Sequence, residues 1–314
     1  MHASCVSVNS AVARARAYLE NRGIERFDRV TELLAEHLLG KAFLEIITNR
    51  SLTITRAQAC TFAHGVRAYA QGTPLAYITG HTYFAGREFK VGPGVFIPRP
   101  DTEAVVREAI RYLRKLDPES PRPGRKLYAI DLCTGTANIA ISLARDMPNL
   151  HIWAIDISPA AIDSARVNVA THKVASQVHI LRGDLLTPLR QRVAPGTIDL
   201  IVSNPPYIAP EVVSTLPRQV RKEPLLSLDG GEEGASYFRR IIPESSLWLK
   251  KGGMLLVEIG FDQAQLVASL VREYEEAFER PRIITDITGT PRVVTARRTQ
   301  GDPCLELSNQ HHQK

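Results

Sequence analysis

The chain has 314 residues, of which 44% are hydrophobic and 23% are charged. This composition is typical of globular proteins and excludes a disordered chain, while the length favours a main domain with a smaller one. No apolar run reaches the roughly 18 residues of a transmembrane helix, so we expect no membrane partner. The formal net charge of +6 favours contact with nucleic acid or a ribonucleoprotein, although many soluble proteins are equally basic.

The four cysteines lack the spacing of a disulfide framework, and neither they nor the nine histidines have the spacing of a metal site. The cysteines are Cys5, Cys60, Cys133 and Cys304. Scattered, reduced thiols favour a cytoplasmic protein without a metal. The first ten residues lack the pattern of a secretory signal, and Glu20 and Glu25 weaken the pattern of a mitochondrial address.

Residues 1–74 are predicted to form a small helical domain. Apolar residues recur at helical spacing through Val30, Leu34 and Leu38, and Gly40 is a suitable C-cap. A second helical stretch covers residues 55–68. We find no strand signal in this part of the chain.

Residues 75–100 are predicted to form a hairpin linker. Pro74 interrupts the helical pattern at its start. Residues 77–91 then alternate in places between apolar and polar side chains, with Gly80 and Gly86 as turn points. This pattern indicates two short strands joined by a tight turn.

Residues 101–299 are predicted to form an α/β domain. Asp101 and Thr102 are N-cap candidates for a helix over Glu103–Leu116. Strands then alternate with helices, which predicts a mostly parallel, Rossmann-like sheet with helices on both faces. The expected strands cover Leu127–Leu132 and residues 151–155, 178–181, 198–202 and 254–259, and the expected helices cover residues 138–145, 159–172 and 236–249. Residues 300–314 are polar and are predicted to be a disordered tail.

A candidate cofactor loop follows the first of these strands, which ends in Asp131. The loop consists of Cys133, Thr134, Gly135, Thr136 and Ala137. It places backbone N–H groups and a carboxylate at the carboxyl edge of the sheet, where ligands bind in doubly wound folds. Gly135 would let the backbone approach a ligand closely. Such junctions are common, so this loop alone is a weak cofactor signal.

Two further acids end the next two strands. Asp156 is placed to hydrogen-bond both hydroxyls of a ribose, while Ser158 takes the role of N-cap for the following helix. Asp184 is placed to accept a hydrogen bond from an adenine amino group, with Leu185 packing on the ring. Acids at three successive strand ends therefore predict a nucleoside cofactor.

The fourth strand leads into an Asn-Pro-Pro-Tyr motif, which consists of Asn204, Pro205, Pro206 and Tyr207. A proline disfavours helical backbone in the residue before it, so Asn204 and Pro205 are held extended, and Pro206 has no N–H. The Asn204 side-chain oxygen and the Pro205 carbonyl then form a rigid pair of acceptors that matches an –NH2 group. Tyr207 supplies a flat face for a planar amide or base. An Asx-Pro turn with an aromatic anchor is the purely structural alternative.

This motif resembles that of class I methyltransferases which modify planar exocyclic nitrogens. The resemblance implies S-adenosyl-L-methionine as cofactor and the four residues of the motif as catalytic residues, with Asn204 also contacting the cofactor. An amide nitrogen is a poor nucleophile, and two acceptors that hold both of its hydrogens direct its lone pair at the methyl group. Alignment of this kind supplies on the order of 7–11 kcal/mol. No strong base is needed, because the methylated nitrogen is acidic.

From about residue 74 to residue 298 the chain resembles the HemK/PrmC-type family of release factor glutamine methyltransferases. The matching motifs are Phe96-Ile-Pro-Arg-Pro-Asp-Thr-Glu103, the Asn-Pro-Pro-Tyr motif, Glu223-Pro224, Leu228-Asp-Gly-Gly231 with Gly234, Glu258-Ile-Gly260 with Gln263, and Arg292-Val-Val294. The resemblance implies a class I methyltransferase fold and an N-terminal helical domain that helps to hold the substrate. It also implies methylation of the glutamine of a Gly-Gly-Gln sequence in a peptide chain release factor.

The cofactor loop departs from this family, which usually carries glycines where this chain has Cys133 and Ala137. Cysteine at the first place occurs in a sister family that acts on a large-subunit ribosomal protein. The methyl group of Ala137 is expected to lie near the methionine moiety of the cofactor. The residues expected to hold the cofactor are Asp131, Cys133, Thr134, Gly135, Thr136, Ala137, Asp156, Asp184, Leu185 and Asn204.

Other functions remain open at this point. A glutamine of a ribosomal protein fits the same motif, and so does the amino group of an adenine in DNA or RNA. A methyltransferase acting on duplex nucleic acid must flip the base and needs a basic surface, yet residues 1–74 show no dense stripe of Lys and Arg. A non-catalytic or antibiotic-pathway relative is a third hypothesis, which the residues at positions 133 and 137 suggest.

Overall fold

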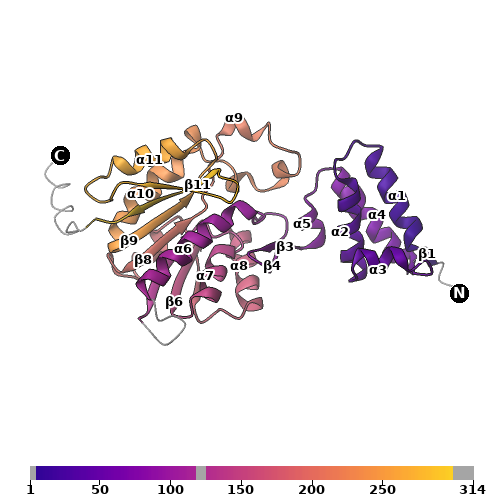
Figure 1. The fold of residues 1–314 in the computed structure, drawn as a ribbon, viewed down its shortest axis with the longest axis horizontal. Coiled ribbons are helices and arrows are strands. Elements are labelled where there is room, and N and C mark those ends of the chain that lie inside the picture. Colours follow the sequence, from indigo (N-terminus) through magenta and orange to yellow (C-terminus); the bar gives the residue numbers. More distant parts are fainter. Residues whose placement is uncertain (1–4, 118–124, 300–314) are drawn as a thin grey trace. The chain divides into compact units, whose positions relative to one another are not determined.

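The computed structural model describes residues 5–117 and 125–299, so the predicted tail at 300–314 lies outside the described residues. The chain divides into two compact units. The smaller comprises residues 1–81 and 217–222, and the larger comprises the remaining residues to 314. The smaller unit thus extends past the boundary expected at residue 74. Figure 1 shows the helices of the smaller unit and the sheet of the larger one.

The smaller unit is built mainly from helices. They are α1 (Val8–Glu20), α2 (Phe27–Leu39), α3 (Phe43–Thr48), α4 (Arg56–Ala70) and α5 (Leu75–Thr79). Buried side chains such as Leu19, Ile46 and Val66 form their common core. As predicted, α2 ends at Gly40, which adopts left-handed backbone. Thr55 caps α4 in a capping box with Gln58.

Two expectations for this part of the chain were wrong. A short antiparallel pair, β1 (Cys5–Ser7) with β2 (Thr53–Thr55), lies where no strand was expected, because strands of three residues are too short to show a period. The predicted hairpin also begins later than expected. Leu75–Thr79 is helical and ends at Gly80, and the strands are β3 (His81–Phe84) and β4 (Arg87–Lys90).

Helix α6 has the predicted bounds, Glu103–Leu116, but its predicted capping is wrong. A 3-10 turn over Pro100–Thr102 precedes it, and no side chain caps the helix. Thr102 already has helical backbone, and its hydroxyl faces the sheet, where it accepts a hydrogen bond from Asn204. Thr102 therefore hydrogen-bonds a residue at the edge of the sheet instead of capping α6.

The larger unit contains a seven-stranded sheet in the order β10-β11-β9-β8-β5-β6-β7. Strands β9, β8, β5, β6 and β7 are parallel, and β11 and β10 extend the sheet antiparallel, which confirms the predicted α/β class. The strands are β5 (Leu127–Leu132), β6 (Leu150–Asp156), β7 (Val178–Arg182), β8 (Ile198–Ser203), β9 (Leu249–Glu258), β10 (Arg282–Thr285) and β11 (Pro291–Arg297). Strand β10 was not predicted from the sequence.

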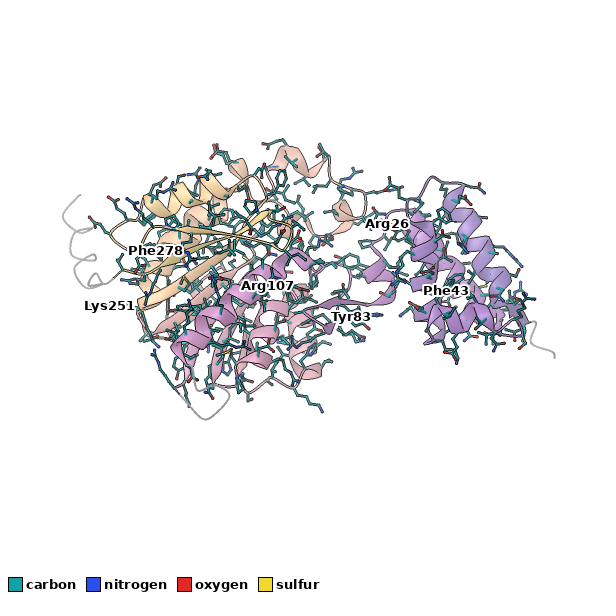
Figure 2. All side chains as sticks on the ribbon, viewed as in Figure 1. Arg26, Phe43, Tyr83, Arg107, Lys251 and Phe278 are labelled. Atoms are coloured by element: carbon teal, nitrogen blue, oxygen red, sulfur yellow. The ribbon has the colours of Figure 1, made fainter. Side chains whose placement is uncertain are left out.

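Helices cover both faces of this sheet (Figure 1). Helices α6, α7 (Asn138–Asp146) and α8 (Pro159–Thr171) pack on one face, and α10 (Ser236–Trp248) and α11 (Ala264–Arg272) pack on the other. Helix α11 was not predicted. Figure 2 draws the side chains that fill these layers; Phe278 belongs to the second core, whereas Lys251 is exposed. The parallel strands bring their carboxyl ends to one edge, where the candidate site lies.

Candidate active site

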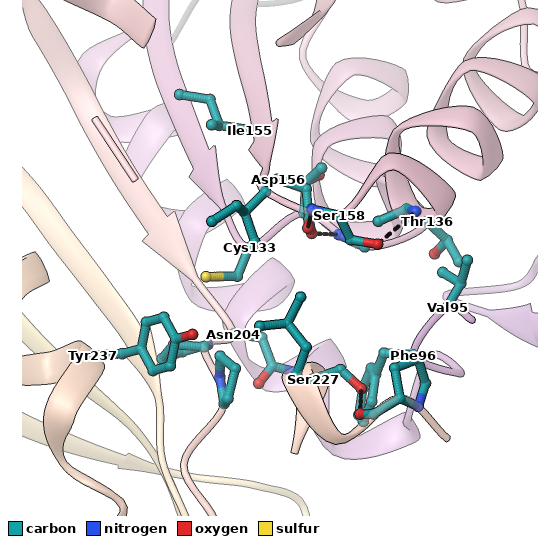
Figure 3. A pocket seen from close by; sticks show the side chains of 18 of the residues that line it. Val95, Phe96, Cys133, Thr136, Ile155, Asp156, Ser158, Asn204, Ser227 and Tyr237 are labelled. Carbon is teal, nitrogen blue, oxygen red and sulfur yellow. Dashed lines mark hydrogen bonds between the residues drawn. The ribbon is translucent and has the colours of Figure 1, made fainter. Parts of the chain in front are cut away.

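A pocket opens at the carboxyl ends of β5, β6, β7 and β8, and it contains about 1110 Å³ of space not filled by atoms, part of it open to solvent. Figure 3 shows Asp156, Cys133 and Asn204 around this space. Of the residues expected to form the site, those that line the pocket are Cys133, Thr134, Gly135, Thr136, Asp156, Asp184, Leu185, Asn204, Pro205, Pro206 and Tyr207. Asp131 and Ala137 do not line it.

Asp156 presents its carboxylate to the pocket from the end of β6. Its Oδ2 accepts a hydrogen bond from the backbone N–H of Gly135 at 2.9 Å, and its Oδ1 accepts one from Ser158 at 2.9 Å. Burial nevertheless raises the pKa of Asp156. Each oxygen keeps a further lone pair, so the carboxylate can accept two more hydrogen bonds from adjacent hydroxyls. Ser158 caps α8, as the sequence predicted.

Asp131 lies beneath the pocket instead of in its wall. Its side chain is 0% exposed, and its Oδ2 accepts hydrogen bonds from the Thr134 hydroxyl at 2.6 Å and from the Ala140 N–H at 3.2 Å. Burial raises the pKa of Asp131 to about 7. Direct contact with a cofactor was expected from its place at the strand end. Its hydrogen bonds instead join the loop after β5 to the first turn of α7.

The loop after β5 has left-handed backbone at Cys133, Gly135 and Ala137, with φ of 57°, 55° and 61°. Glycine would adopt this backbone without strain, and alanine or cysteine does so at a cost of about 1–2 kcal/mol. Ala137 is 0% exposed and belongs to the core between sheet and helices. The turn directs position 137 into the protein, so Ala137 does not line the pocket, and its place near the methionine moiety of a cofactor stays a prediction. A Cβ on Gly135 would meet nothing within 4 Å, so the glycine serves the backbone turn.

Asp184 and Leu185 line the pocket after β7. The Asp184 Oδ2 accepts a hydrogen bond from Arg240 at 2.6 Å, and both side chains of this ion pair are about half exposed. Solvent screens such a pair, so it fixes the position of the carboxylate more than it stabilises the fold. Leu185 is buried and gives this part of the pocket an apolar wall.

The Asn-Pro-Pro-Tyr motif forms the wall opposite Asp156. The Asn204 Nδ2 donates a hydrogen bond to the Thr102 hydroxyl at 3.1 Å, which turns the –NH2 end of the amide toward Thr102 and leaves Oδ1 and the second N–H for other partners. Pro205 and Pro206 are buried and rigid. Asn204 and Asp156 therefore line one pocket, as the sequence predicted.

A buried carboxyl group supports this motif from behind. Glu258 ends β9, is 1% exposed, and accepts a hydrogen bond from the Tyr207 hydroxyl at 3.3 Å. Burial raises the pKa of Glu258 to about 7, and its Oε2 has no hydrogen-bond partner among the described residues. Burial and the adjacent carboxylate raise the pKa of Tyr207 as well, so its hydroxyl stays protonated and donates.

The backbone of Tyr207 is held by Gln263, which precedes α11, and by the turn at residues 228–234. The Gln263 Nε2 donates to the Tyr207 carbonyl at 2.9 Å. A Cβ on Gly230 would lie 2.7 Å from the Tyr207 Cα, and one on Gly234 would lie 2.2 Å from the Tyr207 oxygen. These two glycines allow the motif to pack directly against the turn.

Several residues that line the pocket were not predicted from the sequence. Val95 and Phe96 form one wall, and the carboxylate of the buried Glu223 fixes this segment through the Ile97 N–H and the Arg99 guanidinium. Phe96 opens a motif noted above, but no local pattern distinguishes residues that line a pocket from residues that only connect the hairpin to α6. The other wall residues that were not predicted include Thr102, Ile157, Leu226, Leu228 and Tyr237. Thr102 and Leu228 belong to motifs noted above, but no local pattern marks any of the five as part of a wall.

Within residues 5–117 and 125–299, no group of three or more His, Cys, Asp or Glu side chains is arranged to hold a metal ion. None of the helices in these ranges combines the length and apolar character needed to cross a membrane.

Two family models match the chain: the PrmC N-terminal domain over residues 10–80 and the methyltransferase small domain over residues 112–219. The release factor glutamine methyltransferase of Moorella thermoacetica is 38% identical over 301 residues, covering 94% of this chain and 100% of that protein. Its counterpart in Nitratidesulfovibrio vulgaris is 33% identical over 301 residues, covering 96% of this chain and 98% of that protein.

A solved structure is also similar in sequence. It is described as a protein-(glutamine-N5) methyltransferase (release factor-specific) from Alicyclobacillus acidocaldarius, and it is 30% identical to this chain. The match covers 67% of this chain and 99% of that one, with a TM-score of 0.41.

Proposed function

Because the chain belongs to the release factor glutamine methyltransferase family, we propose that it transfers a methyl group from S-adenosyl-L-methionine to the side-chain amide nitrogen of a glutamine in a peptide chain release factor. The larger unit has the class I methyltransferase fold, and its pocket supplies the site. The helical unit at the N-terminus is the proposed substrate-binding domain.

The pocket residues fit this cofactor. Each oxygen of the Asp156 carboxylate already accepts one backbone N–H and keeps a lone pair, as two ribose hydroxyls require. Ile157 and Leu185 line the pocket beside it and can pack against an adenine, whose amino group then meets Asp184. When bound, the cofactor supplies an electrophilic methyl group on a sulfonium.

Asn204 and Pro205 hold the amide of the substrate. The Asn204 Oδ1 and the Pro205 carbonyl accept one N–H each, so both hydrogens of the glutamine –NH2 are fixed. Its lone pair then points out of the amide plane toward the methyl donor. This arrangement replaces a random encounter by an aligned one, and well-oriented reacting groups gain on the order of 7–11 kcal/mol.

The observation that carries this proposal is the hydrogen bond from the Asn204 Nδ2 to Thr102. It turns the –NH2 end of Asn204 toward Thr102, so the opposite end of the amide, the acceptor Oδ1, is available to the pocket. A pocket that presents acceptors selects a donor, which the amide nitrogen of glutamine provides. Tyr207 and Pro206 restrict the space beside it to a flat group.

The test is methyl transfer from tritiated S-adenosyl-L-methionine to a purified release factor of the same organism. The matched control is the same release factor with the glutamine of its Gly-Gly-Gln sequence replaced by asparagine. We expect label in the first and background in the second, with mass spectrometry placing one methyl group on the glutamine.

Three other substrates belong in the same assay: ribosomal proteins, RNA and DNA. Label confined to a ribosomal protein would keep the amide chemistry and change the partner. Label confined to nucleic acid would overturn the proposal in favour of an adenine amino group, because that group also donates two hydrogens.

A further inference from the structure

We propose that Asn168 is a positioning residue that joins the cofactor loop to the hairpin, so that binding of S-adenosyl-L-methionine in the pocket also stabilises the wall at Val95 and Phe96. The inference rests on the proposed function, because the loop after β5 is the segment that holds this cofactor. Asn168 lies on α8 and does not line the pocket, so it acts on the site through the residues that it contacts.

The side-chain amide of Asn168 is fully buried, and both of its ends have partners. Its Oδ1 accepts a hydrogen bond from the Lys90 N–H at 2.7 Å. Its Nδ2 donates to the Lys90 carbonyl at 3.0 Å and to the Thr136 carbonyl at 3.1 Å. Both hydrogens of the –NH2 group are thus used, and a rotated amide would place this group against the Lys90 N–H. The three hydrogen bonds therefore fix one orientation of the side chain.

Asn168 belongs to a row of polar side chains by which α8 holds β4. Ser164, Asn168 and His172 are spaced four residues apart along α8 and its C-cap, so they lie on one face of the helix. The Ser164 hydroxyl donates to the Lys90 carbonyl at 3.2 Å, and the His172 Nε2 contacts the Glu88 carbonyl at 2.8 Å. Strand β4 pairs with β3 along one edge, and these side chains contact its other edge. Of the three, Asn168 also reaches the cofactor loop.

The two segments that Asn168 joins both contribute to the pocket. Thr136 borders the pocket near the end of the cofactor loop, directly before the left-handed Ala137 at the start of α7. From Lys90 the chain continues to residues 94–96, which also border the pocket (Figure 3). A displacement of the cofactor loop is therefore transmitted to the wall at residues 94–96 through one buried amide.

This connection makes the loop and the wall depend on each other. A cofactor bound to the backbone of the loop lowers the population of states in which the loop is displaced. Each such displacement breaks the hydrogen bond from Asn168 to Thr136, and a buried donor without an acceptor is costly, so the amide that holds Lys90 moves as well. Binding at the loop thus stabilises β4 and the segment that follows it. The cofactor thereby completes the pocket that receives the glutamine.

The first experiment measures the affinity of Asn168→Ala for S-adenosyl-L-methionine by calorimetry. We expect the dissociation constant to rise about fivefold or more, because the variant loses the hydrogen bond that holds the loop. The matched control is Gln177→Ala, which removes an amide whose Nε2 contacts the Ala144 and Leu150 carbonyls, at the other end of α7 from the loop. It should lower thermal stability to a similar extent, yet change the dissociation constant less than about twofold. An equal rise in both variants would leave Asn168 a purely structural role and refute the inference.

The second experiment detects the connection in the wild type without any turnover. Hydrogen exchange of the Lys90 N–H is measured with and without saturating S-adenosyl-L-methionine. Lys90 does not line the pocket, so slower exchange there does not come from direct covering by the cofactor. We expect the exchange to slow about threefold or more. The N–H groups of β10, which forms the opposite edge of the sheet from β7, should exchange at an unchanged rate.

The same exchange measurement in Asn168→Ala completes the test. In this variant the Lys90 N–H should exchange equally fast with and without the cofactor. Unchanged exchange in the wild type, or equal slowing in the variant, would overturn the inference, and the wild-type measurement stands even if Asn168→Ala does not fold. Slowing by the cofactor without methyl transfer to a release factor would contradict the proposed function alone. A wild type that binds no cofactor would contradict both.

Discussion

At the scale of the residue, the site combines two polar side chains whose partners are already arranged. Asp156 is held by two backbone N–H groups, and Asn204 is held by Thr102. Neither needs to reorganise to receive a ligand, and such preorganisation is a large part of what an active site contributes. We expect Asn204 to act mainly on turnover and Asp156 to act mainly on cofactor binding, and these two effects can be measured separately.

Replacing Asn204 by alanine should lower turnover about 10–100-fold, because one N–H of the substrate amide would be left without an acceptor in a buried site. Cofactor affinity should change much less. Steady-state kinetics and calorimetry separate the two effects. Asn149→Ala is a suitable control, since Asn149 hydrogen-bonds Asp117 at the start of β6. Unaltered turnover in Asn204→Ala would remove this residue from the catalytic site.

Replacing Asp156 by asparagine should mainly weaken cofactor binding. The asparagine retains one acceptor oxygen, and its –NH2 opposes either the N–H of Gly135 or that of Ser158. We expect the dissociation constant to rise about tenfold or more, which corresponds to the loss of one charge-assisted hydrogen bond. Calorimetry measures it, with the exposed Asp163→Asn on α8 as control. An unchanged constant would argue against a ribose contact.

At the scale of the element, the Asn-Pro-Pro-Tyr motif depends on the turn packed against it. Gly231 and Gly234 have positive φ, and Gly230 and Gly234 leave no room for a side chain beside Tyr207. Strand β8 places Asn204 at the edge of the sheet, and the turn at residues 228–234 limits how far the Asn-Pro-Pro-Tyr motif can move. Catalytic geometry is sensitive to such support, since a displacement of about 1 Å can cost on the order of 100-fold in rate.

The variant Gly234→Ala tests this support. Its Cβ would lie 2.2 Å from the Tyr207 oxygen and 2.6 Å from the Gln263 Nε2, so the motif has to shift. We expect kcat to fall at least about tenfold while the protein still folds and binds the cofactor.

The control for this variant is Gly289→Ala. Gly289 also has positive φ, at 86°, but a Cβ there meets nothing within 4 Å. It therefore reproduces the backbone strain without the clash. Equal kinetic effects of the two substitutions would show that strain, and not contact with Tyr207, is responsible.

At the scale of the whole molecule, buried carboxyl groups link the stability of the fold to pH. Burial holds the pKa of Asp131 at about 7, well above the ordinary value of 3.8 that applies in the unfolded chain. Between pH 3.8 and about pH 7, the Asp131 carboxyl is protonated in the folded protein and ionised in the unfolded chain. The contribution of Asp131 to stability is therefore full at low pH and is lost as the pH rises toward and through about 7.

This linkage predicts a difference between the wild type and Asp131→Asn. The free energy of unfolding of the wild type should fall relative to that of the variant as the pH rises from about 5 to 7, by up to about 1.4 kcal/mol per pH unit. Denaturant titrations at several pH values measure it. The pKa of His151 is lowered, but His151 is present in both proteins, so its contribution cancels in the comparison. A pH-independent difference would mean that Asp131 is ionised throughout.

Local sequence patterns predicted the class of fold and several residues that line the candidate pocket. The centres of the parallel strands, the bounds of Glu103–Leu116, and the presence of Asp156 and Asn204 in one pocket followed from periodicity and from residues at strand ends. These are local properties: burial on both faces leaves continuous apolar runs, and prolines restrict their own neighbourhood. Local patterns therefore suffice to predict them.

The packing of segments that are distant in sequence sets which side chains reach the pocket. Ala137 and Asp131 turn inward, although both belong to the predicted cofactor loop region. Thr102 is recruited to Asn204 across 102 positions, and Glu258 to Tyr207 across 51. Such hydrogen bonds join segments that are neighbours in space alone, so no periodicity or spacing in the chain records them. The direction of a buried side chain depends on what the rest of the fold packs against it.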